Sequence, residues 1–196
     1  GPGFGGSCFK KDILNLVYIC NHYGLYQVSE YWQQIIKIND WQKRRITKLI
    51  INKLFGTISG KSIAIFGFSF KANTNDTRES PAISISMELL KEGALLRIYD
   101  PKVNYSQIEN DLSQVDNKDA NQNNKKNWQY CENIYDSTIG TDAIVILTEA
   151  QEFKNINWSI ISQNMRAPSW VFDTKGLSNT EEAKGFNMNV WTVGEG

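Results

Sequence analysis

The sequence predicts an α/β protein in which a helical segment precedes a doubly wound parallel sheet domain. Two observations support this prediction. A helical pattern continues from about Val28 to Leu54 without a proline or glycine. A strand, a helix and a second strand then follow one another from Lys61 to Pro101, and such a βαβ unit requires a parallel sheet. We therefore expect residues 1–57 to form the helical region and residues 58–196 the sheet domain.

The first twelve residues combine a glycine-rich loop with the start of a helix. Apolar residues recur at helical spacing from Cys8 to Tyr23, and Gly24 is placed as a helix stop. A thiol at a helix N-terminus lies at the positive end of the helix dipole, which favours the thiolate, and Lys10 and Lys11 add positive charge. Cys8 is thus a candidate nucleophile. Two alternatives stay open at this point: an ordinary buried cysteine, and a leading Gly-Pro left by cloning.

The long helical pattern carries aromatic and aliphatic residues on several faces. At 1.5 Å per residue it would span roughly 40 Å, which is more than one small domain needs. We expect this helix to bridge two domains or to contact a partner subunit, although most of its aromatic residues fit an ordinary core.

Within the sheet domain the elements are expected in the following order. Strands are predicted at Lys61–Gly67, Leu95–Pro101, Ala143–Leu147, Trp170–Asp173 and Asn189–Val193, with helices at Ser80–Gly93, near Glu132–Thr138 and at Asn157–Met165. Ser80 and Pro81 supply an N-cap and a favourable first helical position. Residues 113–127 are polar and are expected to form a mobile surface insertion.

Composition and charge exclude several classes of function. The 21 basic and 21 acidic side chains cancel, which argues against a nucleic-acid or membrane surface. No apolar run reaches the roughly 20 residues of a membrane span. Three unpatterned cysteines, Cys8, Cys20 and Cys131, favour a reducing, cytoplasmic setting. The single histidine, His22, argues against a metal site.

A charged loop follows the first predicted strand. Ligands of open α/β sheets bind beyond the carboxyl ends of the strands, and the segment from Phe68 to Ser80 leaves the sheet there. It carries Lys71, Asp76, Arg78 and Glu79 ahead of a helix N-terminus that can receive an anion. It has no G-x-G-x-x-G; Gly1, Gly3 and Gly6 match that spacing, but no strand precedes them. A solvated charged loop is the alternative.

Three stretches carry a resemblance to a known family. They are Gly3-Phe4-Gly5-Gly6-Ser7-Cys8-Phe9-x-Lys11-Asp12, then Tyr31-Trp32-Gln33-Gln34 with Asn39-Asp40, and Gly67-Phe68-x-Phe70-Lys71 through Asp76-Thr77-Arg78-Glu79-Ser80. In these positions the chain resembles the UDP-glucose/GDP-mannose dehydrogenase family. The resemblance covers nearly the whole chain and is weakest from about 105 to 130. It implies a Rossmann-like sheet domain preceded by a long central helix that forms the dimer interface.

The resemblance also implies a reaction. Members of the family oxidise a sugar CH2OH to a carboxylate in two steps with two NAD. Cys8 would attack the intermediate aldehyde to give a thiohemiacetal, and the second oxidation would leave a thioester for water to hydrolyse. Lys11 would stabilise the thiolate or oxyanion charge, and Asp12 would orient the water. Cys8, Lys11 and Asp12 are the predicted catalytic residues.

Binding roles are implied by the same comparison. Gly3, Phe4, Gly5 and Gly6 would lie against the sugar, with Phe70, Lys71 and Lys175 also binding substrate, and Cys8, Lys11 and Arg78 would face NAD. The family usually has an arginine where Lys175 stands and a small residue where Thr174 stands. Lysine keeps the positive charge but lacks the bidentate fork of arginine, so the resemblance does not define how Lys175 contacts the substrate.

The expected partners are UDP-glucose, UDP-glucuronate and a second copy of the chain. Because the NAD-binding fingerprint and further catalytic residues of the family have no counterpart here, we expect a C-terminal part of such an enzyme that folds, binds UDP-sugar weakly and does not turn over. The alternatives are an enzyme acting on GDP-mannose or a UDP-N-acetylhexosamine, or a non-catalytic nucleotide-binding module that dimerises. Acetylhexosamine enzymes tend to have Gly-Gly-His-Cys, and Ser7 stands in place of that histidine here.

Overall fold

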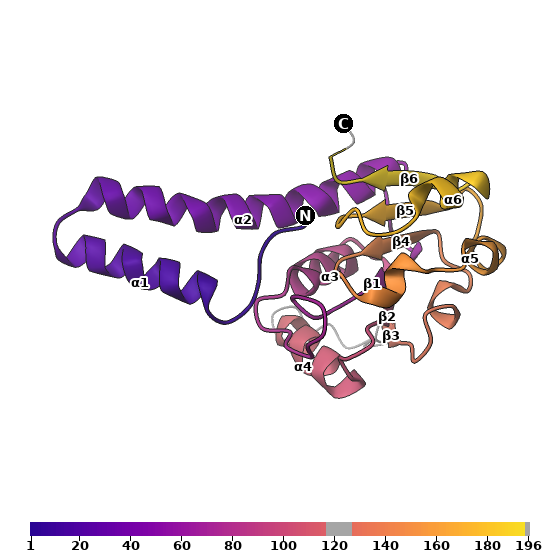
Figure 1. Ribbon diagram of the computed structural model, residues 1–196, viewed down its shortest axis with the longest axis horizontal. Helices are drawn as coiled ribbons and strands as arrows, with labels where there is room; N and C mark the ends of the chain where they lie inside the picture. The colour runs from indigo at the N-terminus through magenta and orange to yellow at the C-terminus, as the bar shows by residue number, and fades with distance from the viewer. Residues whose placement is uncertain (117–126, 195–196) are drawn as a thin grey trace.

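The computed structural model describes residues 1–116 and 127–194. Its first part is a helical hairpin that extends away from the sheet domain (Figure 1). The hairpin consists of α1 (Phe9–His22) and α2 (Tyr26–Lys53). Gly24 lies in the turn between them with φ +70°, a conformation that glycine adopts without strain. Both predicted helices are confirmed, and α2 begins two residues earlier than expected.

The second part is a parallel sheet with the strand order of a dinucleotide-binding fold. In the described ranges it has six strands in the order β3-β2-β1-β4-β5-β6, and each neighbouring pair is parallel. The strands are β1 (Ser62–Phe66), β2 (Leu95–Tyr99), β3 (Trp128–Tyr130), β4 (Ala143–Ile146), β5 (Trp170–Asp173) and β6 (Asn189–Thr192). The predicted doubly wound, Rossmann-like fold is therefore confirmed.

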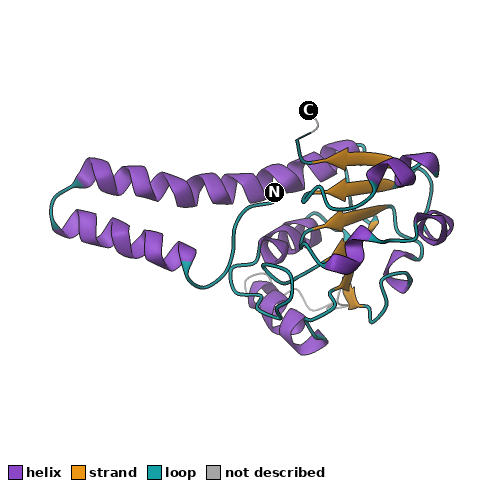
Figure 2. Ribbon diagram, in the orientation of Figure 1, coloured by secondary structure: helices purple, strands orange, loops and turns teal. Residues whose placement is uncertain are grey.

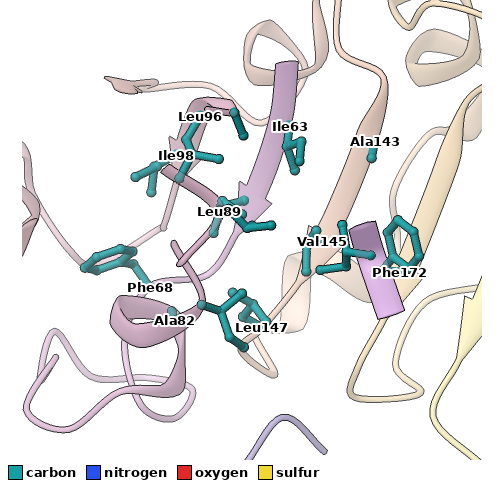
Figure 3. Packing of buried hydrophobic residues seen from close by; sticks show 14 of the residues in the cluster. Ile63, Phe68, Ala82, Leu89, Leu96, Ile98, Ala143, Val145, Leu147 and Phe172 are labelled. Atoms are coloured by element: carbon teal, nitrogen blue, oxygen red, sulfur yellow. The ribbon is translucent and has the colours of Figure 1, made fainter. Parts of the chain in front are cut away.

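Helices cover both faces of this sheet (Figure 2). Successive strand residues point to opposite faces, so Ile63 and Ile65 lie in one core while Ala64 and Phe66 lie in the other. The first core includes α3 (Pro81–Lys91), α4 (Tyr105–Asp116) and the end of α2. Figure 3 shows part of it, with Leu89 of α3 lying among labelled strand residues that include Ile63, Ile98 and Val145. The second core includes α5 (Trp158–Asn164) and α6 (Thr180–Gly185).

The long helix α2 belongs to both parts of the molecule. Near its C-terminal end Ile46, Ile50 and the C-cap residue Leu54 are at most 2% exposed and lie in the first core. Its N-terminal half packs on α1, and Tyr31 and Ile38 there are 66% and 61% exposed. The helix thus anchors the hairpin to the sheet while leaving apolar side chains in solvent.

Some elements differ from the prediction. Between Glu132 and Thr138 we expected a helix, which is wrong: the structure has a 3-10 turn (η1) at Asp136–Thr138. Helices α4 and α6, strand β3 and a 3-10 turn (η2) at Gln151–Lys154 were not predicted. Of the expected polar insertion at 113–127, residues 113–116 complete α4 and residues 117–126 lie outside the described residues. No helix in the described ranges is long and apolar enough to cross a membrane.

We predict that Gly67→Ala destabilises the fold much more than Gly60→Ala. Both glycines have positive φ, +89° and +73°. A Cβ on Gly67 would clash with Thr148, approaching its Oγ1 to 2.6 Å, whereas nothing lies within 4 Å of a Cβ on Gly60. Strain alone costs about 1 kcal/mol, and overpacking adds about 1–3 kcal/mol. Urea unfolding of both variants measures the difference, and equal losses would contradict the prediction.

Candidate active site

The carboxyl edge of the sheet brings three loops together. The loop after β1 spans residues 67–80, Thr148 and Glu149 follow β4, and Thr174 and Lys175 follow β5. Strands β1 and β4 are neighbours whose connections lead in opposite directions, which makes this the switch point where open α/β sheets bind ligands. The Thr148 hydroxyl donates to the Ser69 carbonyl at 2.6 Å and links the first two loops.

Two buried carboxylates fix the backbone of these loops. Asp100 follows β2 and is 3% exposed; its Oδ2 accepts from the Phe68 and Ser69 amides at 2.6 and 3.0 Å. Asp173 ends β5 and is fully buried, and its two oxygens accept from the amides of residues 175–178 at 2.8–2.9 Å. Each carboxylate therefore holds one loop in a single conformation, since charge-assisted hydrogen bonds are the stronger kind.

The N-terminal glycine loop lies against the loop after β1. The Gly6 amide donates to the Arg78 carbonyl at 2.8 Å. A Cβ on Gly5 would clash with the Glu79 carbonyl, and one on Gly6 would lie 2.9 Å from the Phe70 ring. Only glycine permits this approach. The structure thus brings the predicted residues Gly5 and Gly6 to the predicted residue Phe70.

On its other side the glycine loop contacts α2. The Phe4 amide donates to Asn39 Oδ1 at 2.8 Å, and Asn39 Nδ2 donates to the Phe4 carbonyl at 3.1 Å. Further along the helix Gln42 Nε2 donates to the Gly1 carbonyl at 2.8 Å. The loop is therefore held between the central helix and the sheet edge, and no role was predicted for Asn39 from the sequence.

Cys8 occupies the N-cap position of α1, as expected, and is exposed. Its sulfur lies 3.7 Å from the Ser7 hydroxyl. Of the neighbouring lysines, Lys10 forms an ion pair with Glu79 at 2.7 Å, and Lys11 lies 3.9 Å from Asp12 with both side chains about 70% exposed. The alternative that Cys8 is an ordinary buried cysteine is therefore wrong, whereas Cys20 and Cys131 are buried.

Arg78 forms a two-pronged ion pair with Asp76. Its Nε and Nη2 donate to Asp76 Oδ1 and Oδ2 at 2.9 and 2.7 Å. This hydrogen bonding lowers the pKa of the Asp76 carboxyl and raises the pKa of the Arg78 guanidinium. Arg78 itself is 69% exposed, so this ion pair lies at the surface.

The two remaining predicted cations lie at different loops of the same edge. Lys71 is exposed, with its Nζ 5.3 Å from the centre of the Phe70 ring. Lys175 is 12% exposed and its Nζ pairs with Glu149 Oε1 at 2.7 Å. Thr174, which stands where the family has a small residue, is buried and donates to the Ile146 carbonyl at 2.6 Å. The larger residue is accommodated because its hydroxyl has a partner.

The N-terminus of α3 has fewer free donors than the sequence indicated. Ser80 caps it: Oγ accepts from the Ala82 amide at 3.2 Å, and the Ser80 carbonyl accepts from the Ile83 amide at 3.1 Å. Among the described residues no three His, Cys, Asp or Glu side chains gather as a metal site requires. A hollow of about 370 Å³ lies on α2, and its lining includes none of the predicted site residues. It is lined by Trp41, Arg44, Arg45, Lys48, Leu49, Asn52 and Lys53.

A parallel sheet of this strand order defines a Rossmann-like α/β protein. Its candidate ligand site lies at the sheet edge, where the cysteine-bearing glycine loop contacts the charged loop after β1. Residues 64–180 match the UDP binding domain of the UDP-glucose/GDP-mannose dehydrogenase family, and residues 1–41 match the central domain of that family. The chain belongs to the UDP-glucose/GDP-mannose dehydrogenase family, which confirms the resemblance.

Individual relatives agree with this assignment. The chain is 46% identical over 193 residues to UDP-glucose 6-dehydrogenase of Drosophila melanogaster, which covers 98% of this chain and 40% of the relative. The corresponding enzyme of Caenorhabditis elegans is 44% identical over 192 residues, covering 98% of this chain and 39% of the relative. The chain thus spans about two fifths of the length of the curated relatives it matches.

Solved structures share the fold. A UDP-glucose dehydrogenase from Pyrobaculum islandicum superposes with a TM-score of 0.74 at 22% identity, covering 98% of this chain and 38% of the other. UDP-D-ManNAc dehydrogenase from Pyrococcus horikoshii superposes with a TM-score of 0.69 at 26% identity, covering 97% and 39%.

We predict that Arg78→Ala raises the pKa of Asp76 toward its ordinary value. The folded-state pKa is depressed, first by the hydrogen bond from Arg78, so the stability it contributes is present above the unfolded pKa and is lost as pH falls through the folded pKa. An NMR titration of the Asp76 carboxyl measures the shift. Arg166→Ala, which breaks the pair of Arg166 with Asp142, is the control. An unchanged Asp76 pKa in Arg78→Ala would contradict the assignment.

Proposed function

We propose that these residues supply the central and UDP-binding parts of an NAD-dependent dehydrogenase that oxidises UDP-glucose to UDP-glucuronate. One observation carries the proposal: the glycine loop presents an exposed Cys8 beside the loop after β1 of a domain that matches a UDP binding domain. Relatives at 41–46% identity that carry the name UDP-glucose 6-dehydrogenase support the substrate.

In this proposal Cys8 is the covalent nucleophile. Its thiolate attacks the carbon of the sugar aldehyde, forming a carbon–sulfur bond, and the carbonyl electrons pass to oxygen. Loss of hydride from that carbon restores the carbonyl as a thioester, and water then releases the carboxylate and the thiolate. Lys11 stands one turn from Cys8 and stabilises the oxyanion; Asp12 orients the water. Both side chains are exposed and so are free to turn toward a bound substrate.

The substrate is held by residues from the two sides of the site. We assign Gly3, Phe4, Gly5 and Gly6 to the sugar, because their backbone lies between α2 and the loop after β1. Phe70, Lys71 and Lys175 face the nucleotide in this assignment. Lys175 contributes a single ammonium charge where an arginine would offer a fork, and its pair with Glu149 must open for it to reach a phosphate.

NAD would accept the hydride in both oxidations. The three residues predicted to contact NAD are Cys8 and Lys11 at the start of α1 and Arg78 in the loop after β1. All three are exposed, which fits a cofactor that approaches from solvent. The turn after β1 carries Phe68, Ser69 and Phe70 after Gly67 and has no G-x-G-x-x-G. We therefore propose that these 196 residues alone bind the sugar nucleotide without producing NADH.

We predict that UDP-glucose slows the alkylation of Cys8 by iodoacetamide. Cys8 is exposed and the other two cysteines are buried, so selectivity for Cys8 alone says nothing about function. Protection by the substrate does, because the sugar would cover the sulfur. The modified cysteine is identified by mass spectrometry of peptides over time, with and without each nucleotide.

The competing functions give different results in this experiment. Protection by UDP-glucose with none by GDP-mannose supports the proposal. Protection by GDP-mannose or a UDP-N-acetylhexosamine instead assigns a different sugar nucleotide. Binding of UDP-glucose in a titration without any effect on Cys8 would favour a non-catalytic nucleotide-binding module.

We also propose that the chain forms a homodimer through α2. Tyr31, Ile38 and Trp41 lie within about 80° of one another around this helix and are 66%, 61% and 56% exposed. Tyr18 of α1, at 70% exposed, adds to the apolar surface of the hairpin. An exposed apolar surface of this kind marks an interaction site.

The dimer predicts that Ile38→Glu gives a monomer. A carboxylate on the apolar surface of α2 would have to be desolvated when the dimer forms. The second copy would bring an identical charge to the same interface. Gln33→Glu adds the same charge on another, exposed side of α2 and is the control. Sedimentation velocity measures the mass of each variant. A dimer of unchanged affinity for Ile38→Glu would place the interface elsewhere.

A further inference from the structure

We propose that Asn39 of α2 is a positioning residue for the nucleophile: its carboxamide holds the backbone of Phe4 and thereby sets where the glycine loop presents Cys8. The role in sugar recognition rests on the proposed function, whereas the role in holding the loop does not. Asn39 lies in the middle of the long helix, 31 positions after Cys8 in the sequence.

The contact between Asn39 and Phe4 is reciprocal. Asn39 Oδ1 accepts from the Phe4 amide at 2.8 Å and Asn39 Nδ2 donates to the Phe4 carbonyl at 3.1 Å. Both ends of the carboxamide are used, and only one orientation of the amide satisfies both backbone groups. The side chain is 6% exposed. A buried amide with two matched partners specifies one conformation of the bound backbone, because losing either bond leaves a buried polar group unpaired.

The loop needs such a constraint because of its composition. Four of its first six residues are glycine, the residue with the most conformational freedom to lose. Gly3 has φ +116°, and a Cβ there would lie 2.7 Å from Asn39 Oδ1 and 3.3 Å from Lys43 Cγ. The glycine at this position therefore allows the backbone to come close enough for Asn39 to grip Phe4.

The loop after β1 holds the opposite side of the segment. The Gly6 amide bonds the Arg78 carbonyl at 2.8 Å, and Lys10 pairs with Glu79 at 2.7 Å. Glu79 itself has φ +56°, which is strained for a residue with a side chain. Cys8 lies between these two attachments. Without the two Asn39 hydrogen bonds, the one hydrogen bond that still holds residues 1–5 within the described part of the chain is the bond from Gln42 to the Gly1 carbonyl, beside the ring contact between Phe4 and Phe9.

This arrangement makes a selective prediction. In the proposed function the glycine loop faces the sugar and the sheet domain holds the UDP. Loss of the two hydrogen bonds between Asn39 and Phe4 should therefore weaken binding of UDP-glucose and leave binding of UDP unchanged. A side chain that merely filled space would affect neither ligand selectively. Loss of the two hydrogen bonds is expected to raise the dissociation constant for UDP-glucose roughly tenfold.

The experiment uses three variants of this chain. Asn39→Ala removes both hydrogen bonds. Asn39→Asp keeps the volume and the acceptor for the Phe4 amide but places a second acceptor against the Phe4 carbonyl. Gln34→Ala truncates an exposed amide on the same helix and is the matched control. For each, NMR amide exchange is measured at Phe4, Gly6 and the β1 and β4 amides, with dissociation constants for UDP-glucose and UDP.

The expected result is exchange at Phe4 that is roughly tenfold faster in Asn39→Ala, with β1 and β4 unchanged. A similar loss of affinity for UDP-glucose only is expected in both Asn39 variants, because the aspartate keeps the acceptor for the Phe4 amide but repels the Phe4 carbonyl. Two results would overturn the proposal. One is an Asn39→Asp variant that binds UDP-glucose with wild-type affinity. The other is an equal loss of affinity for UDP-glucose and UDP together with faster amide exchange throughout the sheet. If the wild-type chain binds no UDP-glucose, the proposed function fails. Amide exchange at Phe4 still shows whether the hydrogen bonds from Asn39 hold the glycine loop. Should Asn39→Ala not fold, the isosteric Asn39→Asp decides the same question.

Discussion

The burial of one end of α2 in the core of the sheet domain is the constraint on which the rest of the structure depends. Ile46, Ile50 and Leu54 pack under the sheet, and a helix is stiff over two turns, so Asn39 is held at a fixed place about 10 Å before Ile46. The glycine loop takes its position from Asn39, and Cys8 takes its position from the loop. The packing of α2 in the sheet domain therefore determines, through this one rigid helix, where the candidate nucleophile Cys8 lies.

The sequence predicted the parts of the fold in which local pattern and burial agree. The strands β1 and β4 contain the continuous apolar runs Ile63–Phe66 and Ala143–Ile146, and the Ser80-Pro81 start of α3 has its own capping chemistry. Helix α4 was missed because polar side chains outnumber the apolar ones in its sequence, although Ile108 and Leu112 are buried. Strand β3 has three residues at the sheet edge and exists by pairing with β2, which no local pattern reveals.

The candidate site shows the same division. Motifs placed the glycine loop and the loop after β1 in one site, and the structure brings Gly5, Gly6 and Phe70 together. The polar contacts that hold the site join residues far apart in the sequence, such as Lys10 with Glu79 and Phe4 with Asn39. They depend on loop conformations, including the positive φ of Glu79, that only the assembled fold determines. Sequence spacing carries no signal for such pairs.

The buried carboxylates Asp100 and Asp173 also affect how this edge can recognise an anion. They already accept from the Phe68 and Ser69 amides of the loop after β1 and from the amides of residues 175–178, and Ser80 accepts from two amides at the start of α3. In the proposed function, a phosphate beside these amides would therefore be recognised by side chains, whereas glycine-rich nucleotide loops use the main chain. Under that proposal, the preference among ligands would depend on replaceable side chains such as those of Lys71 and Lys175. A relative can change it by single substitutions while the backbone of the edge stays as it is.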